Sequence, residues 1–381
     1  MRRTRRRDFT IRAVKPLRVR FTNAWPSIVL SNRISFIARV RRAASKNSMF
    51  RKIIVAVVKL ALIVALFSFL ASRALKGSAF SEINVDASGV RFLCVGFLFN
   101  LTATIVTIVR WRALLRALDA PLSLVDALRF GFLGFAFNLS PLGAVGGDAT
   151  KIVLVAKKTS VSADVATASV VLDRFIGLYA MFALGLSVAL ASGFYANPAP
   201  LARFTAQALI ALTLASTIFL TLVVLPPSRR RRRERLAGSL PVVGPLLQKA
   251  TAATLLYRDR KRTLLAAFFA TLVVHSFFAL SLYCFARGIY AATPSLVDHF
   301  VLYCSANVGS TIPLSAGPFE YFLDELYPLF NAALNLSFTK GYGATVGVVY
   351  RLATFGVATL GVVFYFTTRS AKTNKTKKQA A

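Results

Sequence analysis

The stretch SLVDALRFGFLGFAFNLSPLGAVGGDATKIVLVAKKTSVSADVATASVVLDR, residues 123–174, decides the fold. It begins as an apolar run, breaks at Pro141 and the glycine-rich segment behind it, and continues through a short basic segment. A second apolar run follows and carries the neighbouring residues Asp173 and Arg174. Such features are typical of a membrane protein whose backbone is interrupted where it lines a polar cavity.

The composition agrees with a membrane protein. The chain has 381 residues, of which 56% are hydrophobic, and several segments approach the roughly 20 apolar residues that a spanning helix needs. The formal net charge is +34, but the basic residues lie between and beyond the apolar segments, so we do not expect nucleic acid as a partner. The three cysteines lie within apolar runs and are interpreted as packing residues.

The apolar runs predict an all-α integral membrane protein with about six full transmembrane helices. These spans are expected at about 53–72, 91–110, 163–190, 203–225, 264–286 and 344–367. Two shorter apolar pieces, 124–141 and 296–314, each end in or near Pro-Leu and are predicted to form re-entrant helical hairpins. Two ordinary spans kinked by proline and glycine are the alternative. The domain boundaries are a basic N-terminal arm at 1–52, expected to be disordered, a transmembrane domain at 53–368 and a basic tail at 369–381.

The distribution of lysine and arginine predicts the topology. The segments assigned to the cytoplasm (1–52, 110–119, 149–162, 228–263 and 368–381) contain 38 of these residues, whereas the segments assigned outside (73–91, 191–203, 287–297 and 333–343) contain six. The positive-inside rule then places both termini in the cytoplasm. Met49 directly precedes the first span, so the true start of the protein could also lie there.

An internal repeat accompanies the two short pieces. SLVD occurs at 123–126 and again at 295–298, an offset of 172 residues, and the Pro-Leu pairs at Pro141 and Pro313 share that offset. In each unit a Ser-x-x-Asp helix start precedes the apolar run and an arginine-bearing span follows the break. Because the loop charges make the hairpins enter from opposite sides, we predict an inverted repeat of the kind found in secondary transporters.

The arginines of the two later spans are the main candidate binding groups. Arg174 and Arg351 lie in apolar segments, where a charge is costly, so each needs a partner or a hydrated cavity. The candidate partners are acids of other elements: Asp148, Glu320, Asp324 and Glu325. A guanidinium also presents donors suited to a lipid phosphate. For Asp173, a buried salt bridge and a ligand role both remain open.

The break itself offers further groups. Gly146, Gly147 and Asp148 are expected to open a helix, whose free backbone N–H groups could bind an anion. Asp148 could instead use those donors as an N-cap. Asn138, just before Pro141, is placed to satisfy backbone groups freed by the break.

Catalytic signals are weak, and we predict no enzyme activity, no cofactor and no metal. His275 and His299 lie in unrelated segments without the spacing of a metal site. Glu82 and Asp86, four residues apart, keep one alternative open, a metal-dependent membrane glycosyltransferase or its accessory subunit using a lipid-phosphate sugar. A scaffold for envelope enzymes is a second alternative.

The motifs FNLSPLGAVGGDATKIVLV (137–155) and VVLDRFIGL (170–178), with IPLSAGPFEYFL (312–323), resemble the lysylphosphatidylglycerol synthase transmembrane family, also called flippase-like. The resemblance covers about residues 50–368. It departs from the family pattern before Glu320, where Ala316-Gly317-Pro318-Phe319 replaces a glycine-rich stretch. With the analysis above, it gives these substrate-binding candidates: Asn138, Pro141, Gly146, Gly147, Asp148, Asp173, Arg174, Pro313, Gly317, Glu320 and Arg351.

The resemblance implies a lipid or glycolipid flippase of the bacterial inner membrane. The expected partner is an anionic or aminoacylated phospholipid or a polyprenyl-linked lipid that moves between leaflets. Only 14 residues follow the last predicted span, so the aminoacyl-transferase half of two-part family members, and with it lysyl transfer from tRNA, is not expected. Gly343-x-x-x-Gly347 could pack two helices within one protomer or between protomers, so a homo-oligomer is possible.

Overall fold

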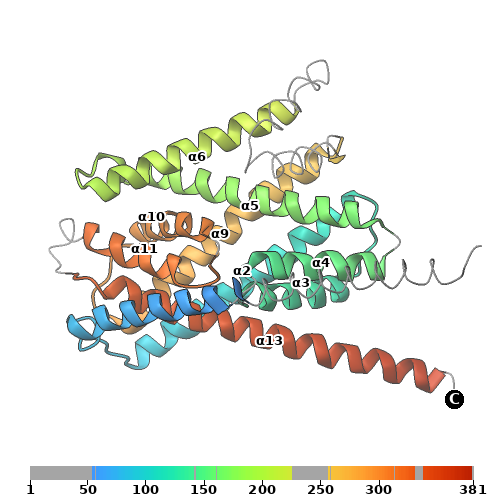
Figure 1. The fold of residues 1–381 in the computed structure, drawn as a ribbon, viewed down its shortest axis with the longest axis horizontal. Helices are drawn as coiled ribbons and strands as arrows, with labels where there is room; N and C mark the ends of the chain where they lie inside the picture. Colours follow the sequence, from blue (N-terminus) through green and yellow to red (C-terminus); the bar gives the residue numbers. More distant parts are fainter. Residues whose placement is uncertain are drawn as a thin grey trace, which may run out of the picture. The chain divides into compact units, whose positions relative to one another are not determined.

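The computed structural model describes residues 54–55, 57–140, 143–159, 161–224, 256–257, 259–312, 314–330 and 338–379. The chain divides into two units, Met1–Val55 and Ala56–Ala381, and the helices of the second unit form the fold in Figure 1. The predicted basic arm at 1–52 lies outside the described residues, as do Pro141 and Pro313.

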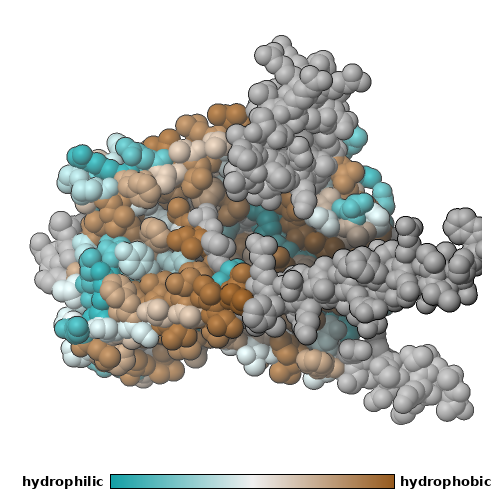
Figure 2. Space-filling model, viewed as in Figure 1, coloured by the Kyte–Doolittle hydropathy of each residue, from teal (hydrophilic) through white to brown (hydrophobic). Residues whose placement is uncertain are grey.

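Six helices in the described ranges are long and apolar enough to cross a membrane, which confirms that prediction. They are Val57–Lys76, α2 (Ala87–Ala117), α5 (Ala163–Ala191), α6 (Pro200–Val224), α9 (Lys261–Ile289) and α13 (Tyr342–Gln379). A short 3-10 helix, η1 (Phe194–Ala196), lies between α5 and α6. Large apolar side chains such as Phe204, Leu214 and Leu352 are exposed on these helices, and Figure 2 shows apolar surface over the middle of the visible face. Such a surface suits contact with lipid chains.

Two helices run further than predicted. The second span was expected to end at about residue 110, but α2 continues to Ala117 because Trp111, Leu114 and Leu115 extend its apolar face and are buried. Arg110 was assigned to a cytoplasmic loop, and that assignment is wrong: Arg110 is a buried helical residue. At the other end of the chain, α13 continues to Gln379 through the predicted basic tail.

Each of the two short apolar pieces forms helices too short to span a bilayer. The first gives α3 (Leu124–Asn138) and α4 (Ala144–Lys158), and the second gives α10 (Leu296–Ala306), η3 (Asn307–Thr311), α11 (Pro318–Leu326) and η4 (Tyr327–Phe330). A helix of 15 residues reaches about 22 Å, less than the roughly 30 Å of a hydrocarbon core. Both pieces start at a serine cap, in which Ser123 accepts from the Asp126 amide and Ser295 accepts from the Asp298 amide.

The helices occur in the same order twice. A long helix, a short pair and a second long helix appear as α2, α3, α4 and α5, and again as α9, α10, α11 and α13. The first residues of corresponding helices are 172 to 179 positions apart, close to the offset of the repeated SLVD. The order therefore agrees with the predicted repeat, while entry of the hairpins from opposite membrane faces stays a prediction.

The first helices of the two sets, α2 and α9, pack against each other in opposite directions. Near one end of the pair, Gly89 lies against the carbonyl oxygen of Gly288. Further along, Ser281 Oγ donates to the Gly96 carbonyl at 2.8 Å. At the far end Arg110 reaches Thr271. Equivalent helices that run antiparallel are what an inverted repeat requires.

The two short pairs lie on opposite sides of the α2–α9 crossing in Figure 1, with α3 and α4 toward the right and α10 and α11 toward the left. Each pair has its own apolar surroundings. Phe130 and Phe132 of α3 pack with Ile108 and Val357. The α10–α11 pair packs in a second cluster that includes residues of α5, α6, α9 and α13. The two candidate sites are built on these separately packed pairs.

Candidate functional site

The first hairpin holds an arginine, a carboxylate and an amide in one polar group. Arg174 on α5 donates from Nε and Nη2 to Asp148 on α4, with the shortest contact at 2.9 Å. Its Nη2 also donates to Asn138 Oδ1 at the end of α3 at 3.3 Å. The prediction of Asp148 as a partner of Arg174 is confirmed, and this polar group joins α3, α4 and α5.

This group is accessible although it sits on a membrane-spanning helix. The side chains of Arg174 and Asp148 are 42% and 23% exposed. Arg174 is the twelfth residue of α5, about 16 Å along the helix from its start. No hydrogen bond from Arg174 Nη1 to the described residues is observed. The N–H groups of Nη1 therefore remain as donors for a ligand.

The helix break differs from its predicted form. The helix α4 starts at Ala144, and its N-cap is Gly143 with a φ of 59°, which favours glycine. The Gly146 amide already donates to the Gly143 carbonyl at 3.0 Å. Gly146 therefore does not open an anion cradle, and Asp148, one turn inside the helix, is not the N-cap.

Gly147 has a packing role. A Cβ built on Gly147 would overlap Asn138 Oδ1 and the Gly134 carbonyl oxygen of α3. Only glycine lets α3 and α4 approach this closely, and this approach brings Asn138 within reach of Arg174. Gly147 thus shapes the site without presenting a side chain to a ligand.

Asp173 is neutralised by a residue that the sequence analysis assigned elsewhere. Arg110 on α2 donates from Nε to Asp173 Oδ1 at 2.9 Å and also hydrogen-bonds Thr271 on α9. Arg110 and Asp173 are both buried. A buried ion pair that, with Thr271, joins three spanning helices favours the structural interpretation of Asp173 over the ligand interpretation.

Lys151 is the second cation that the sequence analysis misplaced. It was assigned to a cytoplasmic loop, but in α4 it is only 6% exposed. Its ammonium lies over the Trp111 ring, 5.1 Å from the centroid, and its stem packs on Gly134. Within the described part of the chain, no carboxylate forms a salt bridge with Lys151 and no hydrogen bond to it is found, although Asp148 and Asp173 are near enough to interact electrostatically.

The second hairpin contains the corresponding pair. Arg351 on α13 donates from Nε to Glu320 Oε1 on α11 at 2.6 Å, so this predicted partner is confirmed too. Glu320 Oε2 accepts from the Gly317 amide at 2.7 Å and thereby caps α11, where Gly317 has a φ of 103°. Glu320 is fully buried and Arg351 is 16% exposed.

The other two candidate acids pair elsewhere. Arg73 contacts Asp324 at 3.3 Å and Glu325 at 2.7 Å, and Lys340 contacts Glu325 at 3.0 Å. Asp324 also accepts from the Gly341 amide. Thus Asp324 and Glu325 fix the second hairpin to its neighbours, and neither is seen with Arg174 or Arg351.

The glycine pair of α13 packs within the protomer. A Cβ on Gly343 would overlap the Leu323 carbonyl oxygen, and one on Gly347 would lie 3.0 Å from Glu320 Cγ. Gly343 and Gly347 therefore bring α13 against α11, and this surface is used inside one chain.

The remaining candidates have local roles. Asp86 caps α2, accepting from the Gly89 amide at 2.6 Å. His275 bonds Tyr303 Oη and the Gly177 carbonyl, and His299 bonds Tyr327 Oη. Among the described residues no group of three or more His, Cys, Asp or Glu side chains is arranged to hold a metal.

Sequence reasoning missed Arg73, Arg110 and Lys151 as parts of the sites. Two signals in the sequence could have found Arg110 and Lys151. Trp111, Leu114 and Leu115 continue the helical spacing past Arg110, and Lys151 lies three residues after Asp148, on the same helical face. Arg73 has no such local signal, because its partners lie about 250 residues away.

The fold and the site together define a multi-pass membrane protein with charged pairs at two short-helix hairpins. The family described as Lysylphosphatidylglycerol synthase TM region matches residues 54–361, and the chain belongs to this family. No curated protein matches the chain.

Proposed function

We propose that the protein moves a lipid with a phosphate-containing headgroup between the leaflets of a bacterial inner membrane, with both termini in the cytoplasm. The lipid is an anionic or aminoacylated phospholipid or a polyprenyl-linked lipid, and it crosses without covalent change. The family membership supports a role connected with membrane lipids. The direction of transport is open to test in vesicles of defined orientation.

One observation carries the proposal: Arg174 is a half-exposed guanidinium near the middle of a spanning helix, with one edge free of described partners. An arginine at the centre of a spanning helix costs about 2.5–3.5 kcal/mol on insertion scales unless it meets water or a counter-charge. Asp148 supplies one carboxylate, and the exposed remainder fits a hydrated path rather than hydrocarbon. Phosphate oxygens match the donors of the free edge.

The local charge favours an anion. Around the first hairpin three cations (Arg110, Lys151, Arg174) accompany two anions (Asp148, Asp173), which leaves one positive charge. A phosphodiester headgroup carries one negative charge and would balance it. In this mechanism the lipid phosphate binds Nη1 of Arg174, and the positive charge of the buried Lys151 adds electrostatic attraction. The hydrocarbon tails remain in the bilayer.

The repeated helix order supports the transport step. The antiparallel packing of α2 and α9 and the hairpins on either side of them agree with alternating access, in which one half of the molecule moves against the other. The Arg174 binding site would then be open to one leaflet and afterwards to the other.

The test is a leaflet assay in proteoliposomes with headgroup-labelled phosphatidylglycerol and phosphatidylcholine. We expect wild type to move the anionic lipid, and Arg174→Ala to lose at least about tenfold of that rate, the equivalent of one charge-assisted contact. Arg203→Ala is the matched control, because Arg203 is an exposed arginine at the start of α6 without an ion pair to the described residues. Folding of each variant is checked by its melting temperature. An Arg174→Ala variant that is folded and transports at the wild-type rate overturns the proposal.

A further inference from the structure

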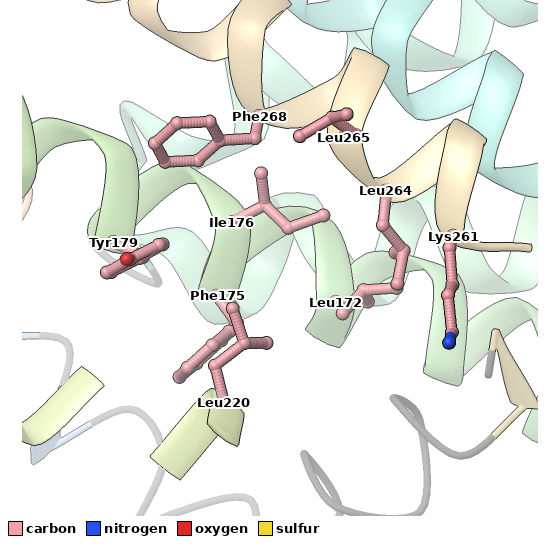
Figure 3. Close-up of a pocket in the computed structure, with 9 residues that line it drawn as sticks. All are labelled: Leu172, Phe175, Ile176, Tyr179, Leu220, Lys261, Leu264, Leu265 and Phe268. Atoms are coloured by element: carbon pink, nitrogen blue, oxygen red, sulfur yellow. The ribbon is translucent and has the colours of Figure 1, made fainter. Parts of the chain in front are cut away.

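An apolar groove lies between α5, α6 and α9, and its lining includes none of the residues of the Arg174–Asp148 and Arg351–Glu320 pairs (Figure 3). Its volume is about 340 Å³. Ile176 and Tyr179 of α5, Leu220 of α6 and Phe268 of α9 form its walls, and Lys261 supplies its charged group. The Tyr179 hydroxyl is already bonded by Thr217 at 3.3 Å, which leaves the walls with little polar character.

The groove and the Arg174 site lie on adjoining parts of α5, since Phe175 also lines the groove, about 100° around the helix from Arg174. Ile176 follows Arg174 by two residues, which is about 200° around a helix. Arg174 points to α4, so Ile176 points away from it, toward α9. The Ile176 side of the groove therefore lies away from the proposed headgroup site.

The groove extends from the first residue of α9 along the helix axis, toward the part of α9 that is expected to lie in the membrane. Lys261 is the first residue of α9 and Phe268 lies seven residues later, about 10 Å along the axis. Since α5, α6 and α9 are all apolar enough to span, we expect the wall from Leu264 to Phe268 to lie alongside lipid chains and Lys261 to lie at the membrane boundary.

Lys261 is the charged residue of the groove lining, and it lies in a basic run at the start of α9. Arg260, Lys261 and Arg262 are consecutive and exposed at the start of α9, where the positive end of the helix dipole already disfavours cations. The first turn of α9 contains no acidic residue. Asp119 is 3.7 Å from Arg260, but both side chains are more than half exposed, so this contact compensates little.

We infer that this groove holds one acyl chain of a resident anionic phospholipid whose phosphate is bound by Lys261. The shape and lining suit hydrocarbon, and the basic run at Lys261 suits a negatively charged headgroup at the same depth as the lipid phosphates. The bound lipid is a structural partner of α5, α6 and α9 and is not the transported molecule. The inference therefore holds or fails independently of lipid transport.

The experiment is native mass spectrometry of the full chain released from nanodiscs containing equal amounts of phosphatidylglycerol and phosphatidylcholine. We expect wild type to retain one phosphatidylglycerol in preference to phosphatidylcholine. Lys261→Gln should lower this preference about tenfold, since it removes one charge-assisted contact. Lys157→Gln, at the exposed end of α4, is the matched control and should keep the preference.

A second variant tests the groove itself. Leu265 is 58% exposed at the edge of the groove, so Leu265→Trp should fold while its ring occupies the space, and retained lipid should be lost. Leu352→Trp, at an exposed leucine of α13, should retain lipid like wild type. Equal retention of both lipids by wild type, equal effects of the two lysine variants, or full retention by Leu265→Trp each overturns the inference. Arg174→Ala should retain the lipid, which separates this result from a failure of transport.

Discussion

The two hairpins have the same helix order but differ in how far the ion pair of their arginine is exposed. At the α3–α4 hairpin the pair Arg174–Asp148 is partly exposed, whereas at the α10–α11 hairpin Glu320 is fully buried beneath Arg351. Glu320 is also tied to the backbone at Gly317, while Asp148 bonds only Arg174 among the contacts observed. The difference is consistent with the proposed function, in which Arg174 binds the lipid headgroup and the Arg351–Glu320 pair fixes the helices.

The charges make the same distinction. Around the second hairpin three cations balance three anions: Arg73, Lys340 and Arg351 with Glu320, Asp324 and Glu325. Around the first hairpin no carboxylate of the described residues forms a salt bridge with Lys151. A neutral cluster around the buried Glu320 and Asp324 is suited to holding the helices together, and a cluster with excess positive charge and a partly exposed Arg174 is suited to attracting an anion.

The largest expected effect comes from breaking the enclosed pair. Arg351→Ala leaves the Glu320 carboxylate buried without its counter-charge, which should cost about 3–5 kcal/mol of unfolding free energy. Arg174→Ala should cost only about 0–1 kcal/mol, because its pair is partly exposed. Denaturant unfolding in a fixed detergent measures both. Adding Glu320→Gln to Arg351→Ala should recover part of the loss, and equal losses for the two arginine variants would contradict the division of roles.

A smaller effect is expected where glycine sets the spacing of the first hairpin. Gly147→Ala places a methyl group against the α3 backbone and Asn138, so we expect a loss of about 1–3 kcal/mol together with reduced lipid transport. Gly177→Ala on α5 is the control, since its nearest neighbour would be Arg110 Nη2 at 3.9 Å. There the added methyl group should be neutral or slightly stabilising. Unfolding of both variants under identical conditions checks the contrast, which fails if Gly147→Ala is also neutral.

The excess charge of the first hairpin can be removed directly. Lys151→Met keeps the length of the side chain over Trp111 but removes the ammonium, so the affinity for anionic lipid should fall about tenfold without loss of stability. Lys340→Met removes a half-exposed partner of Glu325 at the second hairpin and should leave that affinity unchanged. Titration of nanodisc-embedded protein with labelled phosphatidylglycerol measures both affinities. Equal affinities for the two variants would show that the charge asymmetry has no role in binding.

The sequence predicted the spanning helices and, of the four candidate acids, the two that pair with Arg174 and Arg351. Six spans could be predicted because apolar length is a local property. Asp148 and Glu320 could be predicted as partners because an arginine in an apolar segment needs a counter-charge or water. The helix start at Ala144 was misplaced, since the conformation of Gly143 decides it. Asp148 therefore lay one turn further inside than expected.

The missed contacts depend on which distant helices meet. Arg110 and Asp173 are 63 residues apart, and Arg73 and Asp324 are 251 apart. Helical spacing could have placed Arg110 and Lys151 inside helices, but no local pattern identifies the partner of a charge, because a charge at the end of an apolar run looks the same whether it faces headgroups or a buried carboxylate. For Lys151, the packing of α4 on α3 and Trp111 shows that the side chain is buried.

The smallest effect concerns how the two long antiparallel helices begin. The helix α2 has Asp86 as its N-cap, whereas α9 begins with basic residues and no side-chain cap. Hydrogen bonds from the Gly89 amide and the Ser88 hydroxyl lower the pKa of Asp86, so folding favours its ionised form. The contribution to stability is then present above the ordinary aspartate pKa, about 3.9, and is lost as the pH falls through the lowered value.

The corresponding variant is Asp86→Ala, which should unfold more easily than wild type at neutral pH. The two unfolding midpoints should converge as the pH falls below about 4, because protonation then removes the charge-assisted cap from wild type as well. Asp164→Ala, in the first turn of α5, is the control, because Ser162 already caps that helix and the difference from wild type should be smaller. If the difference in unfolding midpoint between Asp86→Ala and wild type stays constant from neutral to acidic pH, the ionised cap does not stabilise α2. The contrast between the two helices would then depend only on the basic residues at the start of α9.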